Sequence, residues 1–127
     1  RLIAGNLLPA AWYAQAQRLR GWFKGEVAKM FEKFDVLLAP STPCTAPLIG
    51  QQTFVLDGTE VPLRPNIGIY TQPISFVGLP VAAVPVQGLG PLPVGVQVIT
   101  APWREDLALR VAFELERTGI CAAPVAR

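Results

Sequence analysis

The chain has 127 residues, 51% of them hydrophobic and 16% charged, with a net charge of +2 and no histidine. This length fits one domain, and the small net charge gives no indication of binding to a polyanion such as nucleic acid. An average soluble domain carries about 25% charged residues, so the composition predicts that much of the surface faces other protein.

The sequence carries no signal for membrane insertion or metal binding. No apolar run reaches the roughly 18 residues that span a bilayer, and no signal-peptide pattern opens the chain. Cys44 and Cys121 stand alone without metal-ligand spacing, which favours buried free thiols in a reducing cytoplasm. Because the first residue is Arg1 rather than Met, we interpret the chain as a cut or processed piece of a longer polypeptide.

A long helix is predicted over about residues 8–34, and Pro9 suits its first turn, where the missing N–H costs nothing. Apolar side chains recur at steps of three and four, and we expect them to pack in the core: Trp12, Ala16, Leu19, Phe23, Val27, Met30 and Phe34. Basic side chains are interleaved with Glu26 and Glu32, which favours a solvated face over a nucleic-acid patch: Arg18, Arg20, Lys24, Lys29 and Lys33.

Gly and Pro divide the middle of the chain into short elements. Asp35–Ala39 is predicted to be a buried strand that ends at Pro40. A Pro- and Gly-rich loop follows, and residues 53–63 within it indicate a small excursion around an Asp57-Gly58 turn. Residues 66–75 fit either a loop or a short helix.

The stretch 71–99 contains two near-continuous apolar runs joined by a loop rich in Gly and Pro. Such runs predict strands buried on both faces within a larger α/β protein, and we place these strands at 80–86 and 94–100. A final helix is predicted over about 104–118, with Gly119 as its cap. The order of elements predicts an α/β fold. Two helices cannot cover both faces of its sheet, so some covering layers must come from outside this chain.

The sequence lacks a complete catalytic centre. Without histidine, neither a Ser-His-Asp nor a Cys-His arrangement can form. Ser41 and Ser75 are the only serines, and neither has the flanking glycines that expose a nucleophile and supply oxyanion-hole amides. Gly88-Leu89-Gly90 precedes a proline, so a tight strand connection explains it better than a phosphate-binding loop. We therefore assign no catalytic and no metal-binding residue.

Several segments resemble the C-terminal portion of one family, the amidase signature hydrolases. The resemblance lies in Asp35–Pro40, Gly78-Leu79-Pro80, the Leu-Pro-Val-Gly-Val-Gln sequence at 92–97 and the helix that starts with Glu105-Asp106-Leu107. Three further stretches are most similar to the biuret and carboxybiuret amidohydrolase branch of that family: residues 8–13, 72–76 and 101–106.

The resemblance implies a fold and a chemistry. The fold is the C-terminal part of an amidase-type mixed β-sheet flanked by helices, with residues 1–127 as one segment of a single amidase domain whose catalytic N-terminal part is absent. The activity is cleavage of a small carboxamide or biuret-like C–N bond by Ser-cisSer-Lys chemistry in that other part, without a metal or organic cofactor. This chain alone is therefore predicted to be inactive.

The resemblance also implies partners. They are the remainder of the amidase domain, a small-molecule amide substrate and, in an assembly, a second copy in a homodimer and a small accessory subunit. Nucleic acid and membrane are not among the expected partners.

Three polar residues are the candidates for binding the substrate. Asn66, Thr71 and Gln72 fall in a segment expected to enter a buried strand as a loop, where they can border the pocket. The alternative is that they cap and turn the backbone. In the related amidotransferases, the resemblance places an acidic residue where this chain has Gly68. Its absence favours a substrate without an ammonium group.

Two other functions stay open at this point. The same scaffold serves as the A subunit of tRNA-dependent glutamine amidotransferases, which pass ammonia to a partner. The third alternative is a non-catalytic interaction module that kept the fold and lost the chemistry.

Overall fold

The computed structural model describes residues 5–123, so the Arg1 start that we interpreted above lies outside the described residues. The elements in chain order are α2 (Ala10–Met30), β1 (Val36–Pro40), β2 (Thr53–Leu56), β3 (Thr59–Pro62), α3 (Leu63–Asn66), α4 (Gln72–Val77), β4 (Val81–Val86), β5 (Val94–Thr100) and α5 (Glu105–Arg117). Within this part of the chain, no helix is long and apolar enough to cross a membrane.

The three predicted strands form one sheet with the order β1-β5-β4. Both pairs are antiparallel, and Ile99 of β5 lies between Leu37 of β1 and Val81 of β4. The connection from Val86 to Val94 is a short loop, as predicted, and it is too short for the crossover that a parallel pair needs. The described part of the fold thus combines helices with antiparallel strands.

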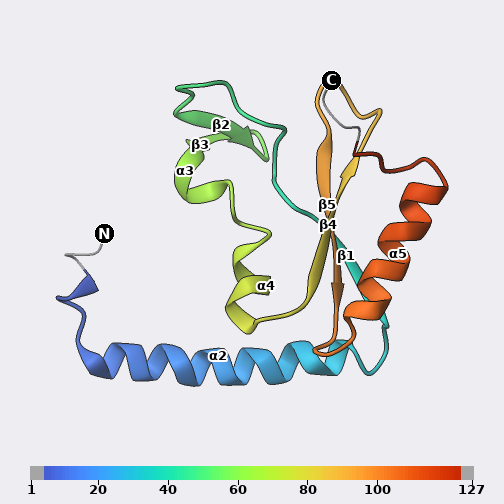
Figure 1. The fold of residues 1–127 in the computed structure, drawn as a ribbon. Helices are drawn as coiled ribbons and strands as arrows, with labels where there is room; N and C mark the ends of the chain where they lie inside the picture. Colours follow the sequence, from blue (N-terminus) through green and yellow to red (C-terminus); the bar gives the residue numbers. More distant parts are fainter. Residues whose placement is uncertain (1–4, 124–127) are drawn as a thin grey trace.

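Helix α5 covers one face of this sheet (Figure 1). Val84, Val98, Ala108 and Cys121 are buried together there, because alternate strand residues point toward the helix. The helix matches its prediction within one residue at each end, and Gly119 follows it with a φ of 76°. Together, α5 and its sheet face form the main hydrophobic core of the described residues.

Helix α4 and the turn before it lie on the opposite side of the sheet (Figure 1). The central strand β5 is buried from Gln97 to Thr100, as predicted for a strand covered on both faces. In β4, by contrast, only Val84 is buried. The reason is its position at an edge of the sheet, where no other strand of the described chain pairs along its length.

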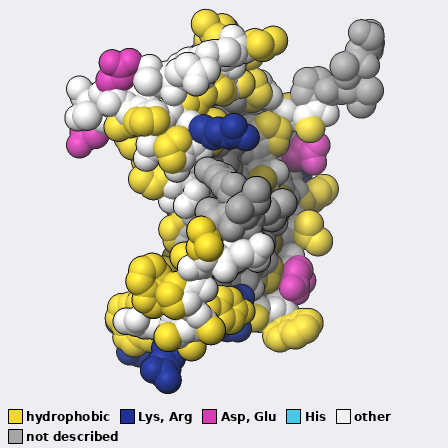
Figure 2. Space-filling view, turned by 90° about the vertical axis from the view of Figure 1, so that its left-hand side faces the viewer, with side chains coloured by type: hydrophobic (Ala, Val, Ile, Leu, Met, Phe, Trp, Pro, Cys, Tyr) yellow, Lys and Arg dark blue, Asp and Glu magenta, His cyan; other side chains and the backbone are white. Residues whose placement is uncertain are grey.

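Helix α2 lies across the base of the other elements (Figure 1). It begins at Ala10, two residues after the predicted start, so that Pro9 precedes the first turn as an extended residue, and it ends at Met30, four residues before the predicted end. The prediction that its apolar stripe packs in the core is not met within residues 5–123. Phe23 and Val27 are half-buried, but Trp12 is 64% exposed and Leu19 is 56% exposed. Among the described residues, α2 is approached by α4 and, near its C-terminal end, by Leu79 and Pro102. Figure 2 shows hydrophobic side chains gathered at this lower end of the molecule.

Residues 53–77 form a hairpin followed by two short helices. The Asp57-Gly58 turn is confirmed: both residues have positive φ, 49° and 73°, as the tight hairpin turn requires. The ambiguous segment 66–75 is largely helical, because α3 and α4 flank a single turn. Our expectation that Gln72 belongs to a loop entering a strand is therefore wrong: Gln72 begins α4, and Pro73 favours the helix start because its N–H is not needed there.

Candidate functional site

The three candidate residues lie around one tight turn between α3 and α4. The backbone N–H groups of Thr71 and Gln72 both donate to the Gly68 carbonyl, at 3.1 and 2.9 Å. The Thr71 hydroxyl donates to the same carbonyl at 3.2 Å, and Asn66 Nδ2 donates to the Pro62 carbonyl at 2.8 Å. Asn66 and Thr71 thus hold the backbone, as the alternative interpretation expected. A contact with substrate stays a prediction for all three residues.

The Gln72 side chain lies over Gly68. A β-carbon added at position 68 would be 3.2 Å from Gln72 Nε2, so a larger residue there would displace the Gln72 amide. The amide therefore occupies space beside the turn that a side chain at position 68 would need.

Gln72 also borders an apolar groove between α2 and α4. The groove has a volume of about 470 Å³, and its other walls come from Leu19, Trp22, Phe23, Pro73 and Phe76. The rings of Phe23 and Phe76 are 6.5 Å apart, and Arg20 Nε donates to the Phe76 carbonyl at 2.6 Å, which joins the two helices. Asn66 and Thr71 do not line this groove, so the structure separates Gln72 from the other two candidates.

Gln97 links the turn to the sheet. Its side chain is only 3% exposed, in the middle of the central strand β5. Nε2 donates to the Pro40 carbonyl at 2.9 Å and to the Tyr70 carbonyl at 3.1 Å. The Gln97 amide therefore joins the end of β1 to Tyr70, the residue that precedes Thr71.

The end of β1 carries a buried hydroxyl beside the same region. The Ser41 backbone N–H donates to the Gly95 carbonyl at 2.8 Å, which continues the pairing of β1 with β5. Ser41 Oγ is buried and has no hydrogen-bond partner among the described residues. A buried hydroxyl without a hydrogen-bond partner costs free energy.

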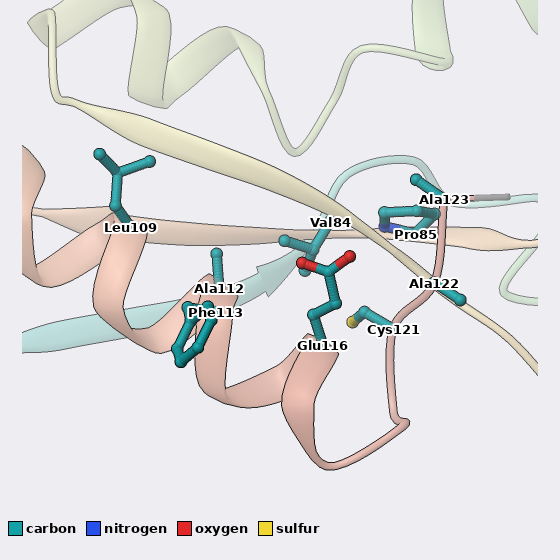
Figure 3. A pocket seen from close by; sticks show the side chains of 9 residues that line it. All are labelled: Val84, Pro85, Leu109, Ala112, Phe113, Glu116, Cys121, Ala122 and Ala123. Carbon is teal, nitrogen blue, oxygen red and sulfur yellow. The ribbon is translucent and has the colours of Figure 1, made fainter. Parts of the chain in front are cut away.

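A second cavity, of about 300 Å³, lies between α5 and β4 (Figure 3). Leu109, Phe113 and Val84 give it apolar walls, Glu116 extends over it from α5, and Cys121 comes from the segment after the helix. None of the three candidate residues lines this cavity. It lies on the α5 face of the sheet, opposite the turn at residues 67–71.

The described residues offer hydrogen bonds but no proton-transfer pair. Ser75 is exposed, and so are Lys24, Lys29 and Lys33, of which Lys29 pairs with Glu26 at 2.7 Å. Among residues 5–123, no group of three His, Cys, Asp or Glu side chains is placed to hold a metal ion. The arrangement around the turn can position and bind a polar molecule, but it contains no activated nucleophile.

Sequence reasoning missed Gln97 as a functional candidate. The signal was available: Gln97 is a polar residue within the otherwise apolar run Val-Gly-Val-Gln-Val-Ile, and a buried amide requires hydrogen-bond partners. Its partners, however, are 57 and 27 positions away. Only the fold identifies them.

Comparison with known proteins gives consistent matches. Residues 1–109 match the sequence profile of the family described as Amidase. The chain is 46% identical over 123 residues to the 1-carboxybiuret hydrolase subunit AtzE of Pseudomonas sp. (strain ADP), covering 94% of this chain and 27% of that protein. It is 36% identical over 109 residues to the A subunit of the glutamyl-tRNA(Gln) amidotransferase of Desulforudis audaxviator, covering 85% of this chain and 21% of that protein.

A solved structure also matches the chain. It is described as a vestigial protein complex that reveals the evolutionary origins of an s-triazine catabolic enzyme. It superposes with a TM-score of 0.90 at 45% sequence identity, covering 97% of this chain and 27% of the matched one. The chain thus spans about a quarter of the length of the relatives it matches.

Proposed function

This chain belongs to the amidase family, and from that membership we propose that it forms the C-terminal part of an amidohydrolase for a small carboxamide of the biuret type. The observation that carries the proposal is the 46% identity over 94% of the chain to a 1-carboxybiuret hydrolase subunit. The identity to the A subunit of an amidotransferase is 36% over 85% of the chain.

In this proposal the catalytic groups come from a segment outside these 127 residues. A serine hydroxyl there, deprotonated through a second serine in a cis peptide and a lysine, attacks the amide carbonyl carbon. The C–N bond breaks, ammonia or an amine leaves with a proton, and water hydrolyses the resulting acyl-enzyme ester. The present chain contributes the last strands of a larger mixed sheet, the closing helix α5 and one wall of the substrate pocket.

We assign that wall to the turn at Asn66–Gln72. Asn66 and Thr71 fix the backbone through hydrogen bonds of 2.8 and 3.2 Å. Gln72 is exposed, and its amide lies over Gly68. An amide group both donates and accepts hydrogen bonds, which matches the alternating N–H and C=O groups of a biuret-like molecule.

The chemistry near the turn argues against glutamine as the substrate. Residues 65–103 contain no charged side chain, so nothing in this stretch can neutralise the ammonium group of an amino acid. Position 68 is Gly, and the Gln72 amide occupies the adjacent space. An uncharged wall of this kind suits a substrate that carries amides and no ammonium group.

The second candidate is the A subunit of a tRNA-dependent amidotransferase, and the 36% identity to such a protein favours it. The two proposals differ in what they need. The amidohydrolase releases ammonia from the amide and water alone, whereas the amidotransferase delivers ammonia from glutamine to a partner that uses tRNA and ATP.

The full-length protein tests the proposal through ammonia release from biuret, carboxybiuret and glutamine, with and without tRNA and ATP. We expect hydrolysis of a biuret-type amide without tRNA or ATP and little release from glutamine. Preferential use of glutamine would support the amidotransferase instead. No hydrolysis of any of these amides would support the non-catalytic module. The isolated chain, assayed in parallel, is expected to be inactive.

The wall itself is tested by Gln72→Ala in the full-length protein, with Gln52→Ala as the matched control. Gln52 is also exposed, and its amide donates only to the nearby Gly50 carbonyl. We expect Gln72→Ala to raise KM for the biuret-type amide by about tenfold, the value of one or two lost hydrogen bonds, and Gln52→Ala to leave KM unchanged. Equal kinetic constants in both variants, with normal folding, would remove Gln72 from the pocket.

A further inference from the structure

We infer that Gln97 is a positioning residue for the substrate pocket: its buried amide fixes the turn that carries Thr71 and Gln72 against the sheet. This inference rests on the proposed function, because it takes that turn as a pocket wall. Gln97 is not a catalytic residue, and it acts through the backbone of Tyr70.

The first argument is the pairing of the amide. Gln97 Nε2 has two N–H donors, and each has an acceptor: the Pro40 carbonyl at 2.9 Å and the Tyr70 carbonyl at 3.1 Å. Two bonds to carbonyls on separate segments fix the side chain in one position. The amide therefore sets the distance of Tyr70 from the end of β1.

The second argument is the free-energy cost of burying a polar amide at position 97. Gln97 is 3% exposed on a central strand, between Ala39 of β1 and Ala83 of β4. An apolar side chain of the same size would be buried there without needing any partner, whereas a buried amide requires hydrogen bonds. The bonds to the two carbonyls account for an amide at a site where packing alone favours an apolar residue.

The third argument is that the turn has no other hydrogen bond to the sheet. Within residues 5–123, the backbone bonds of Ile67–Gln72 go to α3, to the turn itself and to α4, and the Thr71 hydroxyl also stays within the turn. The bond from Gln97 to Tyr70 is the one that joins the turn to β5. Loss of the bond from Gln97 to Tyr70 would therefore allow Thr71 and Gln72, which follow Tyr70, to move relative to the sheet.

The test uses the full-length protein with Gln97→Met and Gln97→Leu. Both replacements are apolar and remove the two N–H donors without burying a charge, and they differ in shape, so that a packing defect of one variant is not mistaken for the loss of the hydrogen bonds. The matched control is Gln87→Met, because Gln87 also donates its amide to a distant carbonyl, that of Ala122 at 2.9 Å, but is exposed and far from the turn in sequence.

Two readouts separate positioning from general destabilisation. We expect both Gln97 variants to raise KM for the biuret-type amide about three- to tenfold while kcat changes less than about twofold, because a pocket wall binds substrate and transition state alike. We also expect faster hydrogen exchange at the amides of Thr71, Gln72 and Ser75, which are bonded within the turn and α4, and unchanged exchange in α5.

The two ways of failing are distinguishable. An unchanged KM in an active protein, or exchange that rises equally in α5, would overturn the positioning role and leave the amidohydrolase proposal standing. If the wild-type protein hydrolyses no amide, the proposed function fails, and the exchange measurement still decides whether Gln97 holds the turn. In every case Gln87→Met is expected to match the wild type in both readouts.

Discussion

Ser41 lies directly against Gly95, where β1 and β5 end their pairing. The Ser41 N–H donates to the Gly95 carbonyl at 2.8 Å, and a β-carbon at position 95 would be 2.9 Å from both Cβ and Oγ of Ser41. Any side chain at position 95 would have to move the end of β1. Gly95 therefore allows the close approach of the two strands beside the turn that Gln97 holds.

Gly95→Ala is expected to destabilise the full-length protein by about 1–3 kcal/mol, the usual cost of overpacking a close contact. Urea denaturation followed by tryptophan fluorescence measures the change. Ser41→Gly in the same chain removes the clashing Cβ and Oγ and should recover part of the loss. Additive losses in the double variant would show that the two residues do not clash.

Gly21→Ala, in contrast to Gly95→Ala, is expected to stabilise the protein. Nothing in the described chain lies within 4 Å of a β-carbon built at Gly21 in α2, so Ala gains helix propensity of up to about 1 kcal/mol without a steric cost. Thermal denaturation of the full-length protein measures it. A loss of stability instead would reveal that an element from outside residues 5–123 packs closely on this side of α2.

Trp22→Ala tests whether the groove between α2 and α4 is covered in the full-length protein. Trp22 is 61% exposed in the described chain, and the proposed remainder of the domain would bury it. Truncating a buried aromatic side chain costs about 3–5 kcal/mol, so we expect a loss of at least about 2 kcal/mol. Lys24→Ala, an exposed position on the same helix, is the control and should change stability by less than about 0.5 kcal/mol. Equal small effects would mean that the groove faces solvent.

The two thiols are expected to react at different rates with a thiol reagent in the native protein. Cys121 is 3% exposed, beneath α5 and β4, whereas Cys44 is half-buried in the loop after β1. Labelling followed by peptide mass spectrometry should find Cys44 modified first and Cys121 only at the rate of local opening. Rapid modification of Cys121 would indicate that the cavity between α5 and β4 opens readily.

Much of the fold could be predicted from local patterns. The strands at 80–86 and 94–100, the helix at 104–118 and the Asp57-Gly58 hairpin follow from apolar runs and turn residues. The packing of α2 could not be predicted, because its stripe looks like core but only Phe23 and Val27 are half-buried here. A sequence pattern records that a face is apolar, but it does not identify what covers that face.

The candidate site was predicted less well than the fold. Asn66, Thr71 and Gln72 were found by their polarity, and they do lie at one turn. Their side chains have different roles: those of Asn66 and Thr71 donate hydrogen bonds to backbone carbonyls, whereas that of Gln72 borders the groove between α2 and α4. Gln97 was missed because its hydrogen-bond partners, the carbonyls of Pro40 and Tyr70, are far from it in the sequence and come close only in the folded chain.

The pairing of β1 with β5 also bears on the order in which the chain is made. Pro40 and Val96 face each other although 56 positions separate them, and β5 is the only strand that β1 pairs with among the described residues. At a ribosomal rate of roughly 5–20 residues per second, Pro40 is synthesised about 3–11 s before Val96, so β1 is complete before its pairing strand exists. During that interval the edge of β1 that later pairs with β5 is unpaired, and an unpaired strand edge is a place where a chaperone can hold the nascent chain.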